Sequence, residues 1–368
     1  VGDWAIPFKF ITDLDRIAAG SSGQVFRGRY LSATVALKQI FTTMLDEDLD
    51  AKNLEEFANE VTTLSRLGNH PNIVQFLGLT KESSIDNPRL FFVTAWCPFS
   101  LEQLLERGNV TFGKPKAPPP FPPKPGHLNR KVSKTIHARN EEEEDFTLRL
   151  RLTNDVIVRM LRQIASGMTH LHENKVLHRD LKPGNVLLTK SFDAQICDFG
   201  NAYVVISLEN QHSKKSTLEN QTLEYNNRYK WSKGSRISRR TAKQGTSAFL
   251  PPEVLRESGS LETFEDGCAV DIWSFGVLCV SMYTRNRPFR HDNTWTKDFG
   301  FEFRRVVAAK KIRPNLPKSA PKDMKRMLEH VLHFDVKKRK SFYKLLRALT
   351  YIERSVLLKS SARKERNM

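Results

Sequence analysis

Hydrophobic and polar positions alternate over much of the chain from Val1 to about Ala95, which is the pattern of half-buried β-strands. The alternation is interrupted by a segment in which Leu54, Phe57, Val61 and Leu64 recur at steps of three and four residues. This spacing predicts a helix with these four side chains on one apolar face. The predicted strands have the sequences FRGRYL, TVALKQI, IVQFLGL and RLFFVTAW, and the helix has the sequence LEEFANEVTTLSRL.

From Leu152 onward the periodicity becomes helical. One long apolar stripe is made of Ile157, Met160, Leu161, Ile164, Met168 and Leu171. The segment DIWSFGVLCVSMY is apolar nearly all round, which is typical of a helix buried in a core. The pattern therefore predicts an α+β fold, in which a small sheet-rich part precedes a larger helical part.

Two segments lack a sustained periodicity. The first, about residues 107–150, contains KPKAPPPFPPKPG, a basic stretch and then EEEED, so we expect a mobile insertion rather than part of a core. The second, about residues 205–243, is polar and basic. No internal repeat is visible, and no linker separates two self-sufficient cores.

The net charge of +18 in 368 residues is concentrated in these two segments. A basic balance suggests an acidic surface or a nucleic acid as partner, but aromatic residues are sparse in both segments and no nucleic-acid-binding motif is present. We expect any such binding to be accessory. The four cysteines show no metal-ligand spacing and are too few for a disulfide framework, so we expect reduced thiols.

No apolar run approaches the length of a membrane helix, and the first residues lack the features of a signal peptide. We therefore expect a cytoplasmic protein. Because the sequence begins with Val1, we also expect it to be a region of a longer protein.

Chemistry-bearing residues gather in HRDLKPGN, residues 178–185, which follows the long apolar stripe. One loop there places Asp180, Lys182 and Asn185 where they could accept a hydroxyl proton, steady a phosphoryl oxygen and hold a metal ion. Asp198 follows in CDFG, at the end of a short predicted strand, and could hold Mg²⁺ across phosphate oxygens.

These motifs make the chain resemble the eukaryotic protein kinases. AAGSSGQV, VALK, Glu60, HRDLKPGN, DFG, PPE and DIWSFG occur in the order of that family and cover almost the whole sequence. The N-terminal part looks most like the tyrosine-kinase-like branch of serine/threonine kinases. The resemblance implies one bilobal domain over residues 1–368, with a small antiparallel sheet lobe (about 1–95), a mainly helical lobe (96–357) and a basic tail (358–368).

The resemblance also implies roles for single residues. The catalytic residues would be Lys38, Glu60, Asp180 and Lys182. The ATP-binding residues would be Gly20, Gly23, Val25, Ala36, Lys38, Thr94, Ala95, Cys97 and Leu187. The metal ligands, for Mg²⁺ with Mn²⁺ as an alternative, would be Asn185 and Asp198. The regulatory residues would be Arg179, Ser238, Thr241 and Thr246.

Strand geometry supports part of this assignment. Because side chains alternate along a strand, Ala36 and Lys38 share one face while Val35 and Leu37 take the other. Lys38 would reach the ATP phosphates and pair with Glu60 on the predicted helix.

The resemblance implies supporting roles for further residues. His178 and Phe199 look like packing residues, Asp271 like a carboxylate that braces the loop backbone, and Glu253 like a partner of Arg339.

Four readings remain open for function and partners. The leading one is an active Mg-ATP-dependent serine/threonine kinase, because Lys182 and Thr246 match that class. The alternatives are a dual-specificity kinase, a catalytically silent kinase-like scaffold and a basic adaptor. Arg179 suggests control by phosphorylation of Ser238 or Thr241 in the activation segment, residues 198–253, by an upstream kinase or by the chain itself. The proline-rich insertion could bind an SH3-like module or serve as a spacer.

Ala18 departs from the family pattern, in which the phosphate-binding loop begins with glycine. We expect Ala18 to lie where the loop turns in from the first strand and to weaken ATP binding slightly, without abolishing it. Pro251, in place of the usual alanine, affects the expected local loop geometry more than activity.

Overall fold

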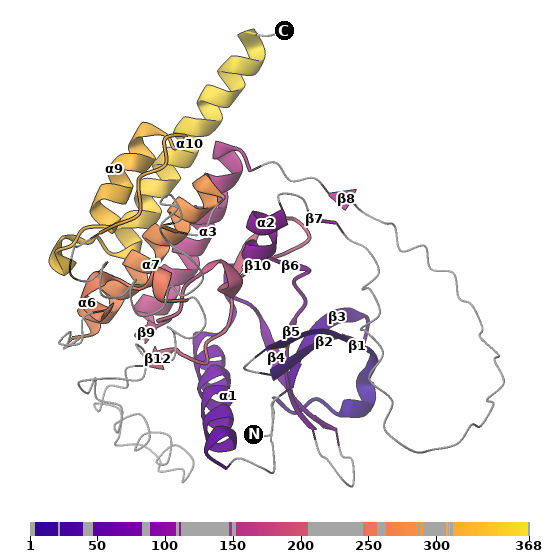
Figure 1. Cartoon of the computed structure of the whole chain (residues 1–368). Coiled ribbons are helices and arrows are strands. Elements are labelled where there is room, and N and C mark those ends of the chain that lie inside the picture. The colour runs from indigo at the N-terminus through magenta and orange to yellow at the C-terminus, as the bar shows by residue number, and fades with distance from the viewer. Residues whose placement is uncertain are drawn as a thin grey trace, which may run out of the picture.

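A computed structural model gives the fold of the chain. It describes residues 4–20, 23–39, 47–82, 89–107, 110–111, 147–148, 152–204, 246–255, 263–285, 288–289, 307, 309 and 312–366. The described residues form a sheet-containing part and a helical part, as the hydrophobic pattern predicts (Figure 1).

A five-stranded antiparallel sheet forms the N-terminal part, with the strand order β1-β2-β3-β5-β4. Its strands are Ile11–Gly20 (β1), Gly23–Tyr30 (β2), Ala33–Gln39 (β3), Phe76–Glu82 (β4) and Arg89–Ala95 (β5). A 3₁₀ helix, Phe8–Phe10, precedes them. The predicted strand IVQFLGL is shorter than expected at its start, because Ile73 instead makes a bridge to Ile196 in another sheet.

The two faces of β3 differ as the alternation predicts. Val35 and Leu37 are fully buried against Ile11, Phe26 and Phe91, whereas Ala36 and Lys38 are half-buried on the opposite face. Burying the apolar face anchors the strand and leaves Lys38 directed away from this cluster.

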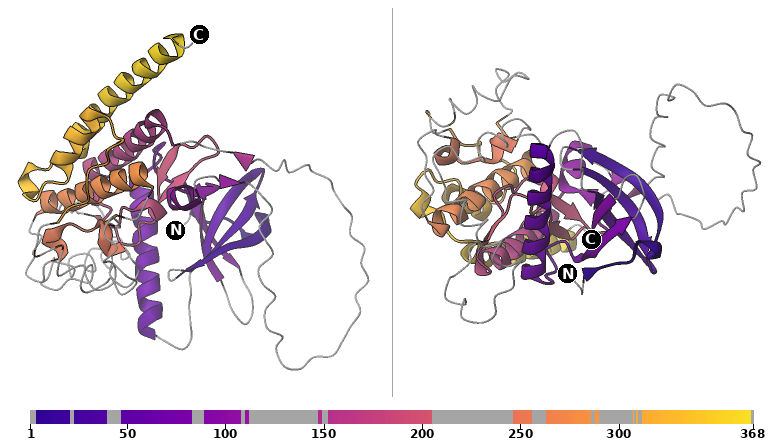
Figure 2. Two further views of the ribbon diagram at one scale, coloured as in Figure 1. Left: turned by 45° about the horizontal axis from the view of Figure 1, so that its top comes forward. Right: turned by 90° about the horizontal axis from the view of Figure 1, so that it is seen from below.

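Helix α1 (Glu47–Leu67) follows β3 and stands between the sheet and the helical part in the views of Figures 1 and 2. Leu64 is buried, and the ring of Phe57 lies edge-on to Phe92 with centroids 6.3 Å apart. Leu54 is 45% exposed, so its predicted place in the apolar contact is wrong. Periodicity identifies a helix face, but a side chain on it is buried only where a partner packs against it.

The helical part is built mainly from three long helices. Among the described residues, the α-helices after α1 are Leu101–Arg107 (α2), Asn154–Glu173 (α3), Pro252–Leu255 (α6), Phe264–Thr284 (α7), Lys322–Val331 (α9) and Phe342–Arg366 (α10). The 3₁₀ helices here are Pro183–Asn185, Thr246–Phe249 and Val336–Lys338. All six residues of the predicted apolar stripe are buried on α3, which packs along α10.

Helix α7 is apolar nearly all round and carries a capping box between Thr263 and Asp266 at its N-terminus. We expected no apolar run of the length of a membrane helix, but this helix is long and apolar enough to cross a membrane. It is longer than the apolar segment DIWSFGVLCVSMY, because it begins at Phe264 and that segment begins at Asp271. It is the one such helix among the described residues, and 83% of its most apolar window is buried inside the protein. It is therefore the core helix that the pattern predicts.

Short strands connect the long helices and carry the candidate site. They are Phe99–Ser100 (β6), Val110–Thr111 (β7), Thr147–Leu148 (β8), Val176–Leu177 (β9), Val186–Leu188 (β10), Ala194–Ile196 (β11) and Tyr203–Val204 (β12). β10 pairs with β6 and β11, and β9 pairs with β12. The loop with HRDLKPGN therefore lies between β9 and β10, and Asp198 follows β11 directly.

Candidate active site

Lys38 lies at the centre of a group of charged side chains drawn from β3, α1 and the segment after β11. Its Nζ atom is 2.8 Å from Oε2 of Glu60 and 3.5 Å from Oδ1 of Asp198. The predicted pairing of Lys38 with Glu60 is therefore present, and Asp198 joins it. Three residues far apart in sequence form one ionic cluster.

The charges in this cluster stabilise one another. Burial opposes the charged form of Lys38, but the nearby carboxylates of Glu60 and Asp198 outweigh it and hold the pKa of Lys38 above its ordinary value. The charge of Lys38 in turn lowers the pKa of Asp198. Burial raises the pKa of Glu60, although Lys38 opposes that shift. Asp198 is thus held as a carboxylate, the form that binds a cation.

Asp180 is buried in the loop after β9. Its Oδ2 accepts hydrogen bonds from Nζ of Lys182 at 2.8 Å and from Nδ2 of Asn185 at 3.2 Å. Its Oδ1 is buried and has no hydrogen-bond partner among the described residues. Because buried carboxylate oxygens are rarely unsatisfied, this atom is suited to accept a proton or a hydrogen bond from a ligand. Burial also raises the pKa of Asp180.

Asp271 on α7 holds the backbone of this loop. Its Oδ2 accepts from the N–H of His178 at 2.9 Å, and its Oδ1 accepts from the N–H of Arg179 at 2.7 Å. The brace that the resemblance implied is confirmed. It supports an unusual conformation, because Arg179 has a φ of 68°, in the left-handed region.

His178 is fully buried, with its ring centroid 5.3 Å from that of Phe199. Its Nε2 lies 3.1 Å from the carbonyl oxygen of Cys197. These contacts agree with a packing role rather than a catalytic one.

Asn185 and Asp198 are brought together by the backbone. The N–H of Cys197 donates to the carbonyl oxygen of Asn185 at 3.0 Å, which places the two predicted metal ligands on adjoining segments. The side-chain NH₂ group of Asn185 donates to Asp180, so its amide oxygen is the atom that could bind a cation. One carboxylate and one amide oxygen fit Mg²⁺, which commonly takes few protein ligands beside phosphates and water. Within the described residues, no cluster of three His, Cys, Asp or Glu offers a self-contained metal site.

The phosphate-loop residues lie on the β1–β2 hairpin. Gly20 and Gly23 pair with each other at the end of the described strands. Ala18 pairs with Val25 within the strands, just after a register shift in β1. The expectation that Ala18 occupies the turn into the loop is therefore wrong. The strand pairing continues for two more residues beyond Ala18, and its side chain is exposed.

The predicted adenine-contacting residues come from several strands: Thr94 and Ala95 end β5, Ala36 lies on β3 and Leu187 on β10. Thr94 is buried and pairs with Ala36 on β3. The N–H of Ala95 donates to the carbonyl oxygen of Gln75 at 2.9 Å, so its carbonyl oxygen is the atom that Ala95 could offer to a base. Leu187 is half-buried in β10, within the sheet that also holds Phe99 and Ser100.

Cys97 is buried, and its Sγ donates to Oε1 of Gln195 at 3.1 Å. Burial raises the pKa of the Cys97 thiol to about 11, so it remains protonated at neutral pH. Burial likewise raises the pKa of Cys197. Both cysteines are free thiols, as expected, and the ATP-binding role of Cys97 stays a prediction.

The predicted regulatory residues are only partly described. The guanidinium of Arg179 lies 6.0 Å from the ring centre of Tyr203, and burial lowers the pKa of Arg179 to about 10. Ser238 and Thr241 lie outside the described residues, as do the proline-rich and basic stretches of the insertion. Thr246 begins a 3₁₀ helix, but its side chain is also outside the description.

The predicted partnership of Glu253 with Arg339 is present. Nη1 and Nη2 of Arg339 donate to the two carboxylate oxygens of Glu253 at 2.5 and 3.0 Å. This bidentate ion pair joins the end of the activation segment to the segment before α10.

Sequence reasoning missed Asn59, which precedes Glu60 on α1. Its Nδ2 lies within hydrogen-bonding distance of three carbonyl oxygens in the turn after Asp198. Its place next to Glu60 is the one sequence signal that could have identified it.

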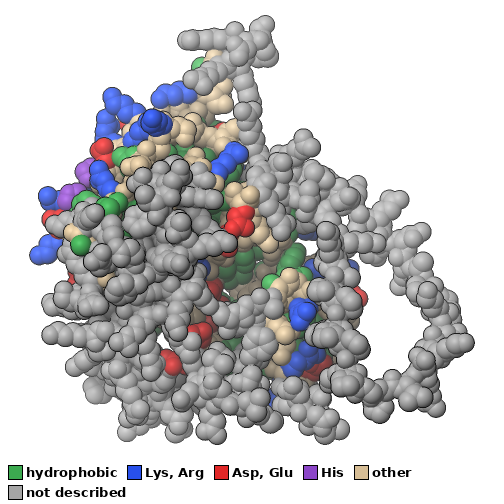
Figure 3. Space-filling view, viewed as in Figure 1, with side chains coloured by type: hydrophobic (Ala, Val, Ile, Leu, Met, Phe, Trp, Pro, Cys, Tyr) green, Lys and Arg blue, Asp and Glu red, His purple; other side chains and the backbone are tan. Residues whose placement is uncertain are grey.

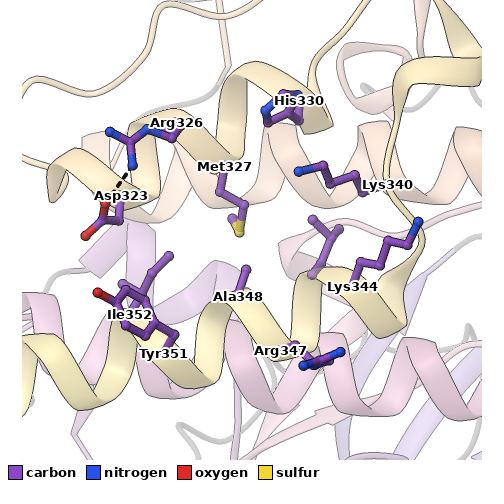
Figure 4. Close-up of a pocket in the computed structure, with 11 residues that line it drawn as sticks. Asp323, Arg326, Met327, His330, Lys340, Lys344, Arg347, Ala348, Tyr351 and Ile352 are labelled. Atoms are coloured by element: carbon purple, nitrogen blue, oxygen red, sulfur yellow. Dashed lines mark hydrogen bonds and ion pairs between the residues drawn. The ribbon is translucent and has the colours of Figure 1, made fainter.

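The surface is hollowed between the two parts, and apolar and acidic side chains are visible inside the hollow (Figure 3). A separate groove of about 650 Å³ lies between α9 and α10 (Figure 4). Met327, Leu345, Ala348 and Ile352 contribute its apolar surface, and basic side chains surround it. No residue with a predicted catalytic or nucleotide-binding role lines this groove.

Comparison with known proteins agrees with the site geometry. A family profile described as "Protein kinase domain" matches residues 136–350, and one described as "Protein tyrosine and serine/threonine kinase" matches residues 11–235. A probable LIM domain-containing serine/threonine-protein kinase of Dictyostelium discoideum is 26% identical over 94% of this chain and 40% of its own length.

Two further relatives come from an animal and a plant. A mitogen-activated protein kinase kinase kinase of Caenorhabditis elegans is 25% identical over 92% of this chain and 26% of its own length. A probable serine/threonine-protein kinase of Arabidopsis thaliana is 28% identical over 97% of this chain and 26% of its own length. The chain thus spans between 26% and 40% of the length of these three relatives.

Proposed function

The chain belongs to the protein kinase family, and we propose that it transfers the γ-phosphate of Mg-ATP to serine and threonine hydroxyls of proteins. Relatives that are mitogen-activated protein kinase kinase kinases support its place in the tyrosine-kinase-like branch. The observation that carries the proposal is the cluster in which Lys38 contacts both Glu60 and Asp198. A catalytically silent relative would be expected to lack a member of this set.

Lys38 binds and orients the ATP phosphates in this proposal. Its ammonium group keeps its positive charge because two carboxylates lie beside it, and Glu60 holds the side chain from α1. A pre-oriented cation at the phosphates lowers the barrier to transfer because it need not reorganise during the reaction.

Asp180 orients the acceptor hydroxyl and accepts its proton at Oδ1, the buried oxygen that has no hydrogen-bond partner among the described residues. Lys182 contacts the other oxygen of Asp180 and is close enough to stabilise charge on the transferring phosphoryl group. Asn185 restrains Asp180 through its amide and keeps the carboxylate in one orientation.

Asn185 and Asp198 would hold Mg²⁺. When bound, this ion neutralises charge on the phosphate oxygens. The low pKa of Asp198 keeps its carboxylate ionised for this task. Gly20 and Gly23 at the hairpin end let backbone amides approach the phosphates. Ala36, Thr94 and the carbonyl oxygen of Ala95 face the base.

A phosphate-transfer assay tests the proposal. The chain is incubated with ATP labelled at the γ-phosphate, a generic basic protein as acceptor, and Mg²⁺ or Mn²⁺. We expect transfer by the wild-type chain, almost none by Asp198→Asn, and full transfer by Asp323→Asn, a matched change at an exposed carboxylate. Equal signals from the wild type and Asp198→Asn, or no transfer by the wild type with either metal, would overturn the proposal.

Acceptor specificity is tested on the same product by identifying the phosphorylated amino acid. We expect phosphoserine and phosphothreonine, because Lys182 is the residue that serine/threonine kinases carry at this position. Phosphotyrosine at a comparable level would instead indicate a dual-specificity enzyme.

Regulation by phosphorylation of the activation segment is the remaining part of the proposal. Arg179 lies in the catalytic loop next to Asp180, where its guanidinium could receive a phosphate through charge-assisted hydrogen bonds. We expect Thr241→Ala or Ser238→Ala, or both together, to remove the difference in specific activity between phosphatase-treated and untreated protein. An unchanged difference in all three variants would exclude control through these residues.

A further inference from the structure

Asn59 connects α1 to the segment that follows Asp198. Its Nδ2 lies 3.2 Å from the carbonyl oxygen of Phe199, 3.1 Å from that of Gly200 and 2.8 Å from that of Ala202. These three oxygens converge because the turn is closed on itself, with the N–H of Ala202 donating to the carbonyl oxygen of Phe199 at 2.9 Å. One amide group therefore lies within hydrogen-bonding distance of three carbonyl oxygens of the same turn.

Glu60, the next residue along α1, holds the same turn from its other side. The backbone N–H of Phe199 acts on the Glu60 carboxylate and lowers its pKa, and the same carboxylate contacts Lys38. Phe199 is thus held through its N–H by Glu60 and through its carbonyl oxygen by Asn59. Two consecutive residues of α1 fix the backbone that directly follows Asp198.

This backbone needs support, because Asp198 has a φ of 65°, in the left-handed region that residues with a side chain seldom adopt. Such conformations persist where surrounding contacts hold them. The Asp198 carboxylate reaches Lys38 in this conformation. Release of the turn would allow the backbone to relax and would carry the carboxylate away from Lys38.

We propose that Asn59 is a positioning residue whose amide clamps the turn after Asp198, so that α1 places the Lys38–Glu60 pair and the metal-binding carboxylate together. The proposal rests on the proposed kinase function for its effect on activity. The clamp itself is a property of the folded chain. Displacement of α1 would break the Glu60 and Asn59 contacts together.

The experiment compares Asn59→Asp with Asn59→Ala. Asp has nearly the same shape as Asn but lacks the NH₂ donor, and it turns a carboxylate toward three carbonyl oxygens. The matched control is Asn174→Ala, which removes an amide that donates to the carbonyl oxygen of His170 at 2.9 Å, at the C-terminal end of α3. Thermal unfolding of each protein shows that the comparison is made on folded chains.

The first readout is hydrogen–deuterium exchange of residues 197–204 in the absence of nucleotide and metal. We expect faster exchange in both Asn59 variants than in the wild type and Asn174→Ala. This readout does not require activity, so it tests the clamp even if the wild type transfers no phosphate. Unchanged exchange in the two Asn59 variants would overturn the proposal.

The second readout is the Mg²⁺ dependence of phosphate transfer. We expect Asn59→Asp to lower kcat by roughly tenfold and to raise the Mg²⁺ concentration for half-maximal rate severalfold, with KM for the acceptor protein within about twofold. Asn59→Ala should be the milder variant, because it loses the donor without adding repulsion. A larger loss in Asn59→Ala than in Asn59→Asp, without a shift in the Mg²⁺ dependence, would show a packing role and refute the clamp.

Discussion

The Nζ atom of Lys38 on β3 lies 2.8 Å from Oε2 of Glu60 on α1. The Glu60 side chain is only 6% exposed, and this contact joins the sheet to the one helix that also holds the turn after Asp198. Disruption of a buried ion pair leaves an uncompensated charge, so the pair has a large effect on the position of the lysine.

We predict that Glu60→Gln lowers kcat/KM for phosphate transfer by roughly a hundredfold, which corresponds to about 3 kcal/mol. The amide keeps the size of the side chain but removes the charge that holds Lys38. The control is Glu82→Gln, since Glu82 pairs with Arg89 at the end of the sheet remote from Asp180. Comparable losses in the two variants would show that the effect comes from general destabilisation.

We predict that Arg339→Lys lowers the free energy of unfolding by about 3 kcal/mol. The Arg339 side chain is fully buried, and besides Glu253 it donates to the carbonyl oxygens of Ala269 and His333 at 2.9 and 2.8 Å. A lysine ammonium cannot reproduce this planar set of donors. Chemical denaturation measures the change. Arg326→Lys, at an exposed pair with Asp323, should change the same free energy by less than about 0.5 kcal/mol, and equal changes would contradict the prediction.

We predict that Gly167→Ala destabilises the fold although it lies within α3. Alanine favours a helix over glycine by about 1 kcal/mol. The added Cβ, however, would lie 2.7 Å from the carbonyl oxygen of Asn72 and 2.8 Å from Cδ1 of Ile196. Since a backbone oxygen cannot move aside easily, we expect the clash, typically about 1 to 3 kcal/mol, to exceed the gain.

The measurement is again the free energy of unfolding, with Ser166→Ala as the neighbouring control on the same helix. Ser166→Ala should be neutral or slightly stabilising. A Gly167→Ala variant at least as stable as the wild type would show that α3 can shift away from Asn72 and Ile196 at little cost in free energy.

We predict that stability falls as pH drops through about 6.5, the ordinary pKa of histidine, and that His70 contributes to the fall. Burial and the charge of neighbouring His170, whose ring is stacked on His70 at 4.8 Å, lower the pKa of His70. The unfolded chain therefore takes up a proton at this residue before the folded chain does, which favours unfolding in acid. Protonation would also displace the hydrogen bond from the N–H of Asn72 to Nδ1 of His70.

Unfolding temperatures at pH 7.5 and pH 5.5 test this contribution. We expect His70→Gln to show a smaller decrease between the two pH values than the wild type. His330→Gln, a change at an exposed residue of α9, should leave the decrease unaltered. An equal decrease in His70→Gln and the wild type would assign the acid sensitivity to other groups.

Several parts of the fold and the site could be predicted because they depend on neighbours in the chain. Asp180, Lys182 and Asn185 lie within one loop, so their mutual contacts arise wherever that loop is placed. The alternation in β3 correctly predicted that Val35 and Leu37 take one face and Lys38 the other, and the structure shows the first face to be buried. The resemblance then supplied long-range partners, among them Glu60 for Lys38 and Arg339 for Glu253.

Other features depend on what packs against a residue from elsewhere in the chain. Leu54 continues the apolar stripe of α1 but is 45% exposed. Ala18 lies inside a strand rather than at a turn, because pairing with β2 extends to Gly20.

The order of hydrophobic and polar residues thus determined the main strands and long helices, because these follow from local backbone geometry, and the sequence motifs identified the residues that carry the chemistry. The tertiary arrangement decided that Asn59 holds three carbonyl oxygens from a segment about 140 residues later in the chain. The position of one asparagine in the sequence does not reveal which distant backbone groups its side chain contacts. Its role depends on the distance between two elements, and that distance is set by the packing of α1 between the sheet and the helical part.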